Sequence, residues 1–292
     1  MTSGRWRSQF AYSSRVVDVA APLLLLTFIL VSWQLAVRLL ELPTWLLPAP
    51  TEIIAKIFTD RAIIFPQLRV TLYEVIIGYT LAAVLGFFLS VTIVYSNAFR
   101  RGVLPLIIAS QTIPVIAIAP VLVIWFGYND IPRIIITALV AFFPLTVAIV
   151  TGLQTLEREF VDFFRSMNSN EFQTFVKLRL PAALPNIFGG LKVATTLAII
   201  GATISEWVGA SAGLGYLMSQ DTAQLNTTRV FASLVVLGLC GMGFFGTVVL
   251  IERMCMPWVY GRLNLRALAR RMKPRDQSAG TDIEDSGKKT NS

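Results

Sequence analysis

The stretch KLRLPAALPNIFGGLKVATTLAIIGATISEWVGA, Lys177–Ala210, joins a basic, proline-containing segment to a long apolar run. The run Gly190–Ala210 has about the 20 residues that an α-helix needs to cross the hydrocarbon core of a bilayer. We expect Pro181 and Pro185, just before the run, to prevent one continuous helix from entering it. The stretch therefore predicts a membrane span that begins at a polar, broken segment.

The rest of the chain repeats this contrast between apolar runs and polar connections. Hydrophobic residues make up 55% of the 292 residues and charged residues only 14%. Soluble core helices are shorter and amphipathic, so the sequence predicts an all-α, polytopic membrane protein with about six transmembrane helices. The expected spans are 19–39, 75–95, 104–128 (with Pro114 and Pro120 inside), 134–153 (with Pro144 inside), 190–210 and 230–251.

Lysine and arginine are distributed unequally between the two sides of these spans. One side, which includes both termini, holds 18 of them and the other side holds 6. Because cytoplasmic loops carry the excess of basic residues, both termini are predicted to be cytoplasmic. The expected organisation is an N-terminal cytoplasmic segment at 1–18, a membrane domain at 19–262 with a long cytoplasmic loop at about 156–188, and a tail at 263–292. The tail is basic and then polar, a composition typical of partial disorder and of contact with anionic lipid headgroups.

Composition also narrows the chemistry of the chain. The net charge of +8 is explained by cytoplasmic loops and does not require nucleic acid as a partner. No histidine is present, so the commonest general base and metal ligand are missing. The stretch GTDIEDSGKKT, Gly280–Thr290, lacks the spacing of a phosphate-binding loop. GMGFFG, Gly241–Gly246, lies in an apolar run, where glycines more often serve helix packing than dinucleotide binding.

The cytoplasmic loop has a helical pattern of its own. Two groups of apolar residues at helical spacing, Phe160–Met167 and Phe172–Val176, are separated by the sequence NSN, Asn168–Asn170. Asparagine adopts left-handed and turn conformations readily, so the pattern predicts a helix, a turn and a second short helix. From the residues alone, these two helices either lie against the membrane or contact a partner.

Three segments resemble one known family. LRLPAALPNIFGGLKVA, Leu178–Ala194, with EFQTF before it, resembles the cytoplasmic loop of the inner-membrane permeases of ABC importers that work with a binding protein. LPAPTEI, Leu47–Ile53, and SEWVGASAGLGYLM, Ser205–Met218, are similar to the branch that includes nitrate, sulfonate, taurine and thiamine-precursor permeases. The resemblance covers nearly the whole chain and implies the type I ABC importer permease fold in a bacterial inner membrane.

The resemblance implies that the loop is a coupling region seated in a separate cytoplasmic ATPase subunit. Asp162, Phe163, Phe164 and Asn168 stand where the family usually has Glu, Ala, Ala and Gly, so a different packing against the partner is expected. It also implies a periplasmic or lipid-anchored solute-binding protein, a permease homodimer, and ATP-Mg on the partner with no cofactor on this chain. The expected coupling residues are Asp162, Arg165, Asn168, Ser169, Asn170, Glu171, Phe172, Gln173, Thr174, Pro181 and Pro185.

A second set of candidates concerns the translocation path or its gate. Glu206 is ionisable and belongs to an apolar run, which makes it a functional candidate, although it could also lie at the outer interface beside Trp207. The candidates are Gln111, Thr112, Thr203, Ser205, Glu206, Gly213, Gly215 and Tyr216. Those that carry a hydroxyl have an alternative role, because hydroxyls in membrane helices also bond backbone carbonyls of their own helix.

The function implied is uptake of a small polar solute by alternating access. The segment EWVGASAGLGYLM, Glu206–Met218, looks more like the corresponding segment of permeases for pyrimidine precursors of thiamine, or for riboflavin-type compounds, than like that of nitrate permeases. Import of sulfonates, taurine or nitrate is the alternative substrate class. Outside transport, the alternatives are a passive channel or membrane scaffold, and an integral-membrane enzyme, for which no nucleophile motif is present.

Overall fold

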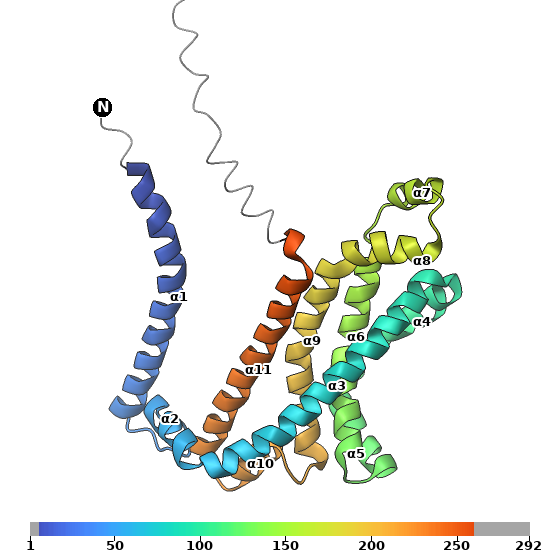
Figure 1. Cartoon of the computed structure of the whole chain (residues 1–292). Helices are drawn as coiled ribbons and strands as arrows, with labels where there is room; N and C mark the ends of the chain where they lie inside the picture. Colours follow the sequence, from blue (N-terminus) through green and yellow to red (C-terminus); the bar gives the residue numbers. More distant parts are fainter. Residues whose placement is uncertain (1–5, 260–292) are drawn as a thin grey trace, which may run out of the picture. The chain divides into compact units, whose positions relative to one another are not determined.

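The computed structural model describes residues 6–259, and the side chains of 20–157 and 159–259. These residues are helical and connected by short turns (Figure 1). The elements are α1 (Trp6–Leu39), α2 (Pro50–Thr59), α3 (Arg61–Tyr95), α4 (Asn97–Ser110), α5 (Val115–Phe126), α6 (Asp130–Gln154), α7 (Arg158–Ser166), α8 (Glu171–Thr174), the π turn η1 (Phe175–Arg179), α9 (Leu180–Gly209), α10 (Leu214–Ala223) and α11 (Thr227–Cys255).

Three long helices, α3, α6 and α9, pack against one another and form the main core. Its buried side chains are mostly alanine, leucine, isoleucine and valine, such as Ala141, Leu145 and Ala198. Small residues permit this close packing, as is usual for membrane helices. A Cβ atom on Gly78 of α3 would lie 2.6 Å from the Thr137 side chain of α6. The core therefore fixes the relative positions of these three helices.

The expected membrane spans are confirmed, with one difference. Among the described residues, five helices are long and apolar enough to cross a membrane, and α4 with α5 makes a sixth span if this bent pair is counted as one. The two halves of this span meet at an angle of 99°, so the run expected at 104–128 is broken rather than kinked. The break falls at Gln111–Pro114, where Pro114 cannot donate a hydrogen bond and instead precedes the first turn of α5.

The prediction that Pro181 and Pro185 interrupt the chain before the fifth span is wrong. The helix α9 runs without a break from Leu180 to Gly209 and contains both prolines. Pro181 lies at the start of the helix, where a backbone N–H is not needed. The π turn η1 directly precedes it and connects α8 to α9, so the fifth span continues into the cytoplasmic loop.

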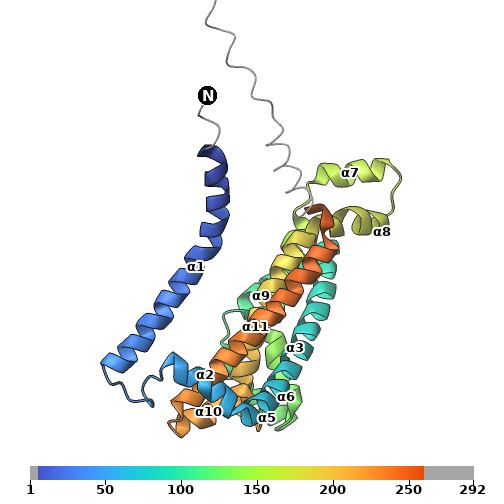
Figure 2. The same cartoon turned by 60° about the vertical axis from the view of Figure 1, so that its left-hand side comes forward.

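The connecting elements gather at the two ends of this core. In both views α7 and α8 lie at one end, while α2, α5 and α10 lie at the other (Figures 1 and 2). On α2, only Ile53 and Ile57 contact the core, whereas Ile54 and Phe58 are exposed. Residues up to Val248 form one compact unit, and the final turns of α11 belong to a second. The expected tail at 263–292 and the start of the expected segment 1–18 lie outside the described residues.

Candidate functional site

The loop expected to be cytoplasmic forms a helical hairpin. Asn168 joins α7 to the next turn in the left-handed conformation, with φ of 60°, as its residue type predicts. Asn170 then caps α8: its side chain accepts a hydrogen bond from the Gln173 N–H at 2.7 Å, and the Gln173 side chain accepts one from the Asn170 N–H. This reciprocal arrangement is a capping box. The sequence between the helices therefore specifies the turn.

An ion pair crosses the same turn. The Arg165 Nη2 atom of α7 lies 2.7 Å from the Glu171 Oε1 atom of α8. The hydrogen bond to Glu171 raises the pKa of Arg165, which is already charged at physiological pH. Asp162 lies 3.8 Å from Arg165 and adds a weaker contact. Both pairs are exposed and contribute little to stability, and only the Arg165–Glu171 pair joins the two helices.

The hairpin leaves an apolar face uncovered, and we call this the hairpin face. Val161 and Thr174 point inward and are buried, but four large apolar side chains are exposed. Exposed apolar patches of this kind mark interaction sites. The hairpin face consists of Phe160, Phe163, Met167 and Phe172. Phe163, one of the departures from the family pattern, thus lies on this face.

The hairpin is joined to the membrane core through η1. Arg179 of η1 stacks over the ring of Tyr95, with its guanidinium carbon 5.4 Å from the ring centroid. Phe175 packs against the same ring, with a centroid distance of 6.0 Å. These two contacts attach the start of the fifth span to the end of α3.

At the opposite end of the core, charged groups are buried between helices. Arg133 of α6 lies 2.7 Å from the Glu74 Oε1 atom of α3, and the two residues are 6% and 0% exposed. The Glu74 oxygens receive no hydrogen bond from the described residues, so charge attraction holds the pair. Arg133 also pairs with Asp130 and donates to the Ala212 carbonyl oxygen at 3.3 Å. This pair links α3 and α6 to the loop after α9.

Glu206 lies close to this pair but binds different partners. Its Oε1 atom accepts a hydrogen bond from the Thr71 hydroxyl at 2.6 Å, and its Oε2 atom accepts one from the Gly215 N–H. Glu206 is 1% exposed, while Trp207 beside it is exposed, and the position of both relative to the outer interface stays a prediction. Its charge is directed at the N-terminal turn of α10, where the helix dipole favours an anion.

The break between α4 and α5 exposes polar groups within an apolar run. Gln111 and Thr112 are both exposed at the break, and the Thr112 hydroxyl donates to the Ala109 carbonyl oxygen at 2.7 Å. The Val115 and Ile116 N–H groups receive no partner among the described residues. Because lipid cannot satisfy such groups, this surface must face water or protein.

The amino-acid sequence was compared with known families and proteins. The family described as "Binding-protein-dependent transport system inner membrane component" matches residues 78–254. The chain belongs to this family. It is an ABC importer permease, a multi-pass protein of the inner membrane, and the family is a transport component rather than an enzyme.

Relatives of the permease include proteins named for different solutes. The chain is 37% identical to the formylaminopyrimidine transport permease protein ThiX of Halalkalibacterium halodurans, over 84% of this chain and 98% of that protein. It is 28% identical to the riboflavin transport system permease protein RibX of Chloroflexus aurantiacus, over 80% of this chain and 88% of that protein. It is also 28% identical to the putative aliphatic sulfonates transport permease protein SsuC of Bacillus subtilis, over 81% and 86%.

A solved structure shares the fold of the permease. It is titled as an inward-facing conformation of the MetNI methionine ABC transporter and matches with a TM-score of 0.59. The match has 19% sequence identity and covers 67% of this chain and 97% of that chain. The type I permease fold expected from the sequence is therefore confirmed.

Several residues expected to line the path or gate of the permease make hydrogen bonds within their own helix. Thr203 and Ser205 donate to the carbonyl oxygens of Ile199 and Ala202, at 2.9 and 2.7 Å. Tyr216 pairs with Gln220 along α10. Gly213 and Gly215 are buried beneath the Glu206 carboxylate. The structure thus brings Glu206, Gly213 and Gly215 into one cluster and places Gln111 and Thr112 elsewhere.

Four residues of this cluster were missed by the sequence analysis: Gln67, Thr71, Glu74 and Arg133. Glu74 and Arg133 flank the apolar runs expected at 75–95 and 134–153, and Arg133 was counted among the six basic residues of the outer side. Opposite charges that flank two apolar runs on the same side could have indicated a pair. No local pattern marks Gln67 or Thr71, because their partners lie more than 130 residues away.

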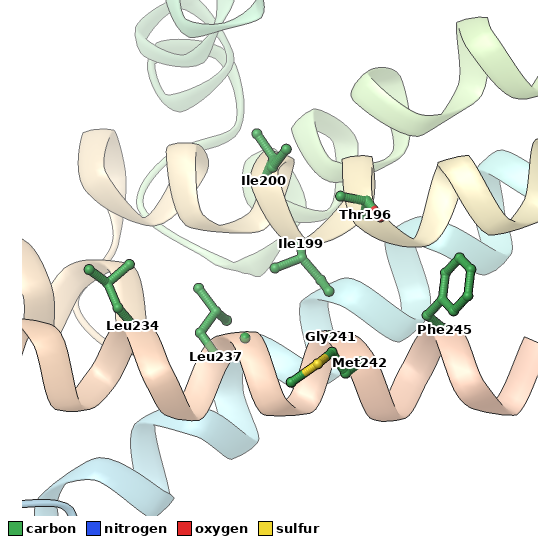
Figure 3. A pocket seen from close by; sticks show the side chains of 9 residues that line it. Thr196, Ile199, Ile200, Leu234, Leu237, Gly241, Met242 and Phe245 are labelled. Atoms are coloured by element: carbon green, nitrogen blue, oxygen red, sulfur yellow. The ribbon is translucent and has the colours of Figure 1, made fainter. Parts of the chain in front are cut away.

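An apolar groove of about 500 Å³ runs between α9 and α11 of the permease. Figure 3 shows Thr196, Ile199 and Ile200 on one wall, with the side chains of α11 on the other. Gly241, from the sequence GMGFFG, contacts Ile199, as expected for helix packing. Gly243 and Gly246 have no such neighbour among the described residues. The groove contains few polar atoms, so it is unsuited to a polar solute.

Proposed function

We propose that the permease imports a small pyrimidine precursor of thiamine, or a riboflavin-like compound, by alternating access driven by a separate ATPase subunit. The overall similarity to ThiX, at 37% identity and over nearly the full length of that protein, carries this proposal. The similarity to RibX supports the same class of heteroaromatic solute. Sulfonates are the alternative, because SsuC is related at 28% identity.

In this proposal the hairpin face is where the ATPase subunit docks. Its four exposed apolar side chains belong to α7, the residue that ends it, and α8. The hairpin continues through η1 into α9, so a push on the hairpin reaches the core along one helix. Closure of the ATPase pair would move this helix and switch the side to which the path opens. The coupling residues expected from the sequence all belong to this hairpin or to the start of α9.

The break at Gln111–Pro114 supports a translocation path for the solute along the surface beside the break. Its free N–H groups and the Gln111 amide need water or a protein partner. A second copy of the permease facing this surface would enclose a polar path between the two chains. A solute-binding protein would deliver the solute to the end that carries α10, since α7 and α8 lie at the opposite end.

The docking proposal is tested by co-purification with the ATPase subunit encoded beside the permease. We expect Phe172→Asp, which puts a charge on the hairpin face, to abolish retention of the ATPase in detergent. Leu46→Asp is the matched control, because Leu46 is an exposed apolar side chain in the turn before α2. Equal retention by both variants would contradict docking at the hairpin face.

The substrate is tested on the solute-binding protein encoded with the permease. We expect calorimetry to detect binding of aminopyrimidines or flavins and no binding of alkyl sulfonates, taurine or nitrate. Uptake of the radiolabelled ligand by vesicles that contain the full complex should then require ATP inside them. If the binding protein bound only a sulfonate, the substrate of the permease would instead be assigned to the sulfonate class, for which SsuC is named.

A further inference from the structure

The loop Ala210–Gly213 and the first turn of α10 are held by side chains of other helices. Three consecutive backbone N–H groups point at them. Gly213 donates to the Gln67 Oε1 atom at 2.7 Å, and Leu214 donates to the Thr71 Oγ1 atom at 2.8 Å. Gly215 donates to Glu206. The N-cap residue Gly213 has no side chain to cap α10, so α3 and α9 supply the caps from a distance.

The Thr71 hydroxyl is the centre of this arrangement. It accepts from the Leu214 N–H and donates to the Glu206 carboxylate at 2.6 Å, so one atom joins α3, α9 and the loop. Thr71 is fully buried. Removal of the hydroxyl would leave both the Leu214 N–H and one Glu206 oxygen without a partner.

The backbone is shaped to fit the Glu206 carboxylate. Gly213 has φ of 119°, and a Cβ atom there would overlap that carboxylate. A Cβ atom on Gly215 would lie 2.8 Å from the Glu206 Oε2 atom and 2.7 Å from the Thr203 carbonyl oxygen. Arg133 adds a fourth contact, through the Ala212 carbonyl oxygen. The exposed part of the loop is Ser211.

We propose that this segment is a strap that closes the outer end of the permease, held by Gln67, Thr71 and Glu206 and released when α9 moves. Glu206 is three residues from the end of α9, and the other end of the same helix leads to the hairpin. A displacement of α9 against α3 would separate Glu206 from Thr71 and free the three N–H groups at once. Release of the strap rests on the proposed coupling to an ATPase. The attachment of the strap by these three side chains, which we call the hold, does not.

The hold is tested first, in membranes without nucleotide. Leu214→Cys, at a fully buried position of the strap, is introduced into a chain in which Cys240 and Cys255 are replaced by serine, and its reaction rate with a membrane-impermeant maleimide is measured. We expect Thr71→Val to raise the rate about tenfold, since two buried hydrogen bonds are lost. Thr71→Ser should restore the parent rate. Thr80→Val is the matched control, because the Thr80 hydroxyl bonds only the Ile76 carbonyl of its own helix.

Release is tested next in the reconstituted complex, with hydrolysis measured in parallel. Trapping the ATPase with ATP and vanadate should raise the Leu214→Cys rate in the parent chain toward that of Thr71→Val. An unchanged rate in Thr71→Val without nucleotide would overturn the strap. A raised rate in Thr71→Val with no response to trapping, in a complex that hydrolyses ATP, would overturn its release. A chain that binds no ATPase would contradict the proposed function alone, while the first measurement still decides the hold.

Discussion

Glu206 and Arg133 show how a membrane protein keeps charges inside its helices. An isolated charge buried in hydrocarbon is very costly, so each needs a specific partner. Arg133 is paired with Glu74, and Glu206 is paired with the N-terminal turn of α10 and with Thr71. The sequence marked Glu206 as unusual, but its partners could not be predicted from spacing. They come from a helix 135 residues earlier and from a turn 9 residues later.

Removal of one partner of the buried ion pair should be strongly destabilising. We expect Arg133→Met to lower the free energy of unfolding by about 3–5 kcal/mol, because Glu74 would remain buried and unpaired. The double variant Glu74→Leu, Arg133→Met should recover most of this loss. Thermal unfolding in detergent measures both. Equal destabilisation by the single and double variants would show that the pair itself contributes the stability.

The strained glycine in the strap gives a second prediction at this scale. Gly213→Ala should be destabilising for two reasons, its positive φ and the overlap with Glu206. Gly127 also has a positive φ, of 79°, but a Cβ atom there would meet only Asn129 at 4.0 Å. We therefore expect the unfolding midpoint to fall more for Gly213→Ala than for Gly127→Ala. Equal falls would mean that the Glu206 carboxylate moves aside freely.

At the scale of elements, apolar length alone was enough to predict the spans, but not their ends or breaks. Two prolines before the fifth span suggested an interruption, yet Pro181 lies in the first turn of α9 and Pro185 is accommodated within it. Pro114, in contrast, does break its helix, at the 99° turn. Proline only removes one donor and restricts its neighbours. Whether the helix continues depends on packing by residues that are distant in the sequence.

The hairpin turn is an element whose local sequence does specify its conformation. We expect Asn170→Ala to remove the cap of α8 and to cost about 1 kcal/mol locally. Hydrogen exchange should then be faster at Gln173 and Thr174, while exchange in α9 beyond Pro185 stays unchanged. At Asn168, glycine should be tolerated and valine should loosen the turn, because its φ is 60°. Uniformly faster exchange along the chain would instead indicate global destabilisation.

At the scale of the whole molecule, the positions of α7 and α10 at opposite ends of the core agree with the charge asymmetry of the loops. The orientation itself stays a prediction. In right-side-out vesicles, and in the same cysteine-free background, Ser211→Cys should react with an impermeant maleimide. Ser166→Cys, in the hairpin, should react only after permeabilisation. The reverse pattern would place the hairpin outside and would exclude docking of a cytoplasmic ATPase on it.

The π turn between the hairpin and the fifth span determines how a change in chain length affects the direction of the hairpin. A π turn holds one residue more than the α-helical turn it replaces. Deletion of Lys177 would let Phe175–Arg179 close into an ordinary α-helical turn, and the direction of the hairpin would change little, because the π turn already absorbs the extra residue. A residue deleted from the α-helical part of α9 would instead rotate the hairpin face about the helix axis by about 100°. The π turn is therefore the place where the chain between the hairpin and the membrane domain can lose a residue without redirecting the hairpin face.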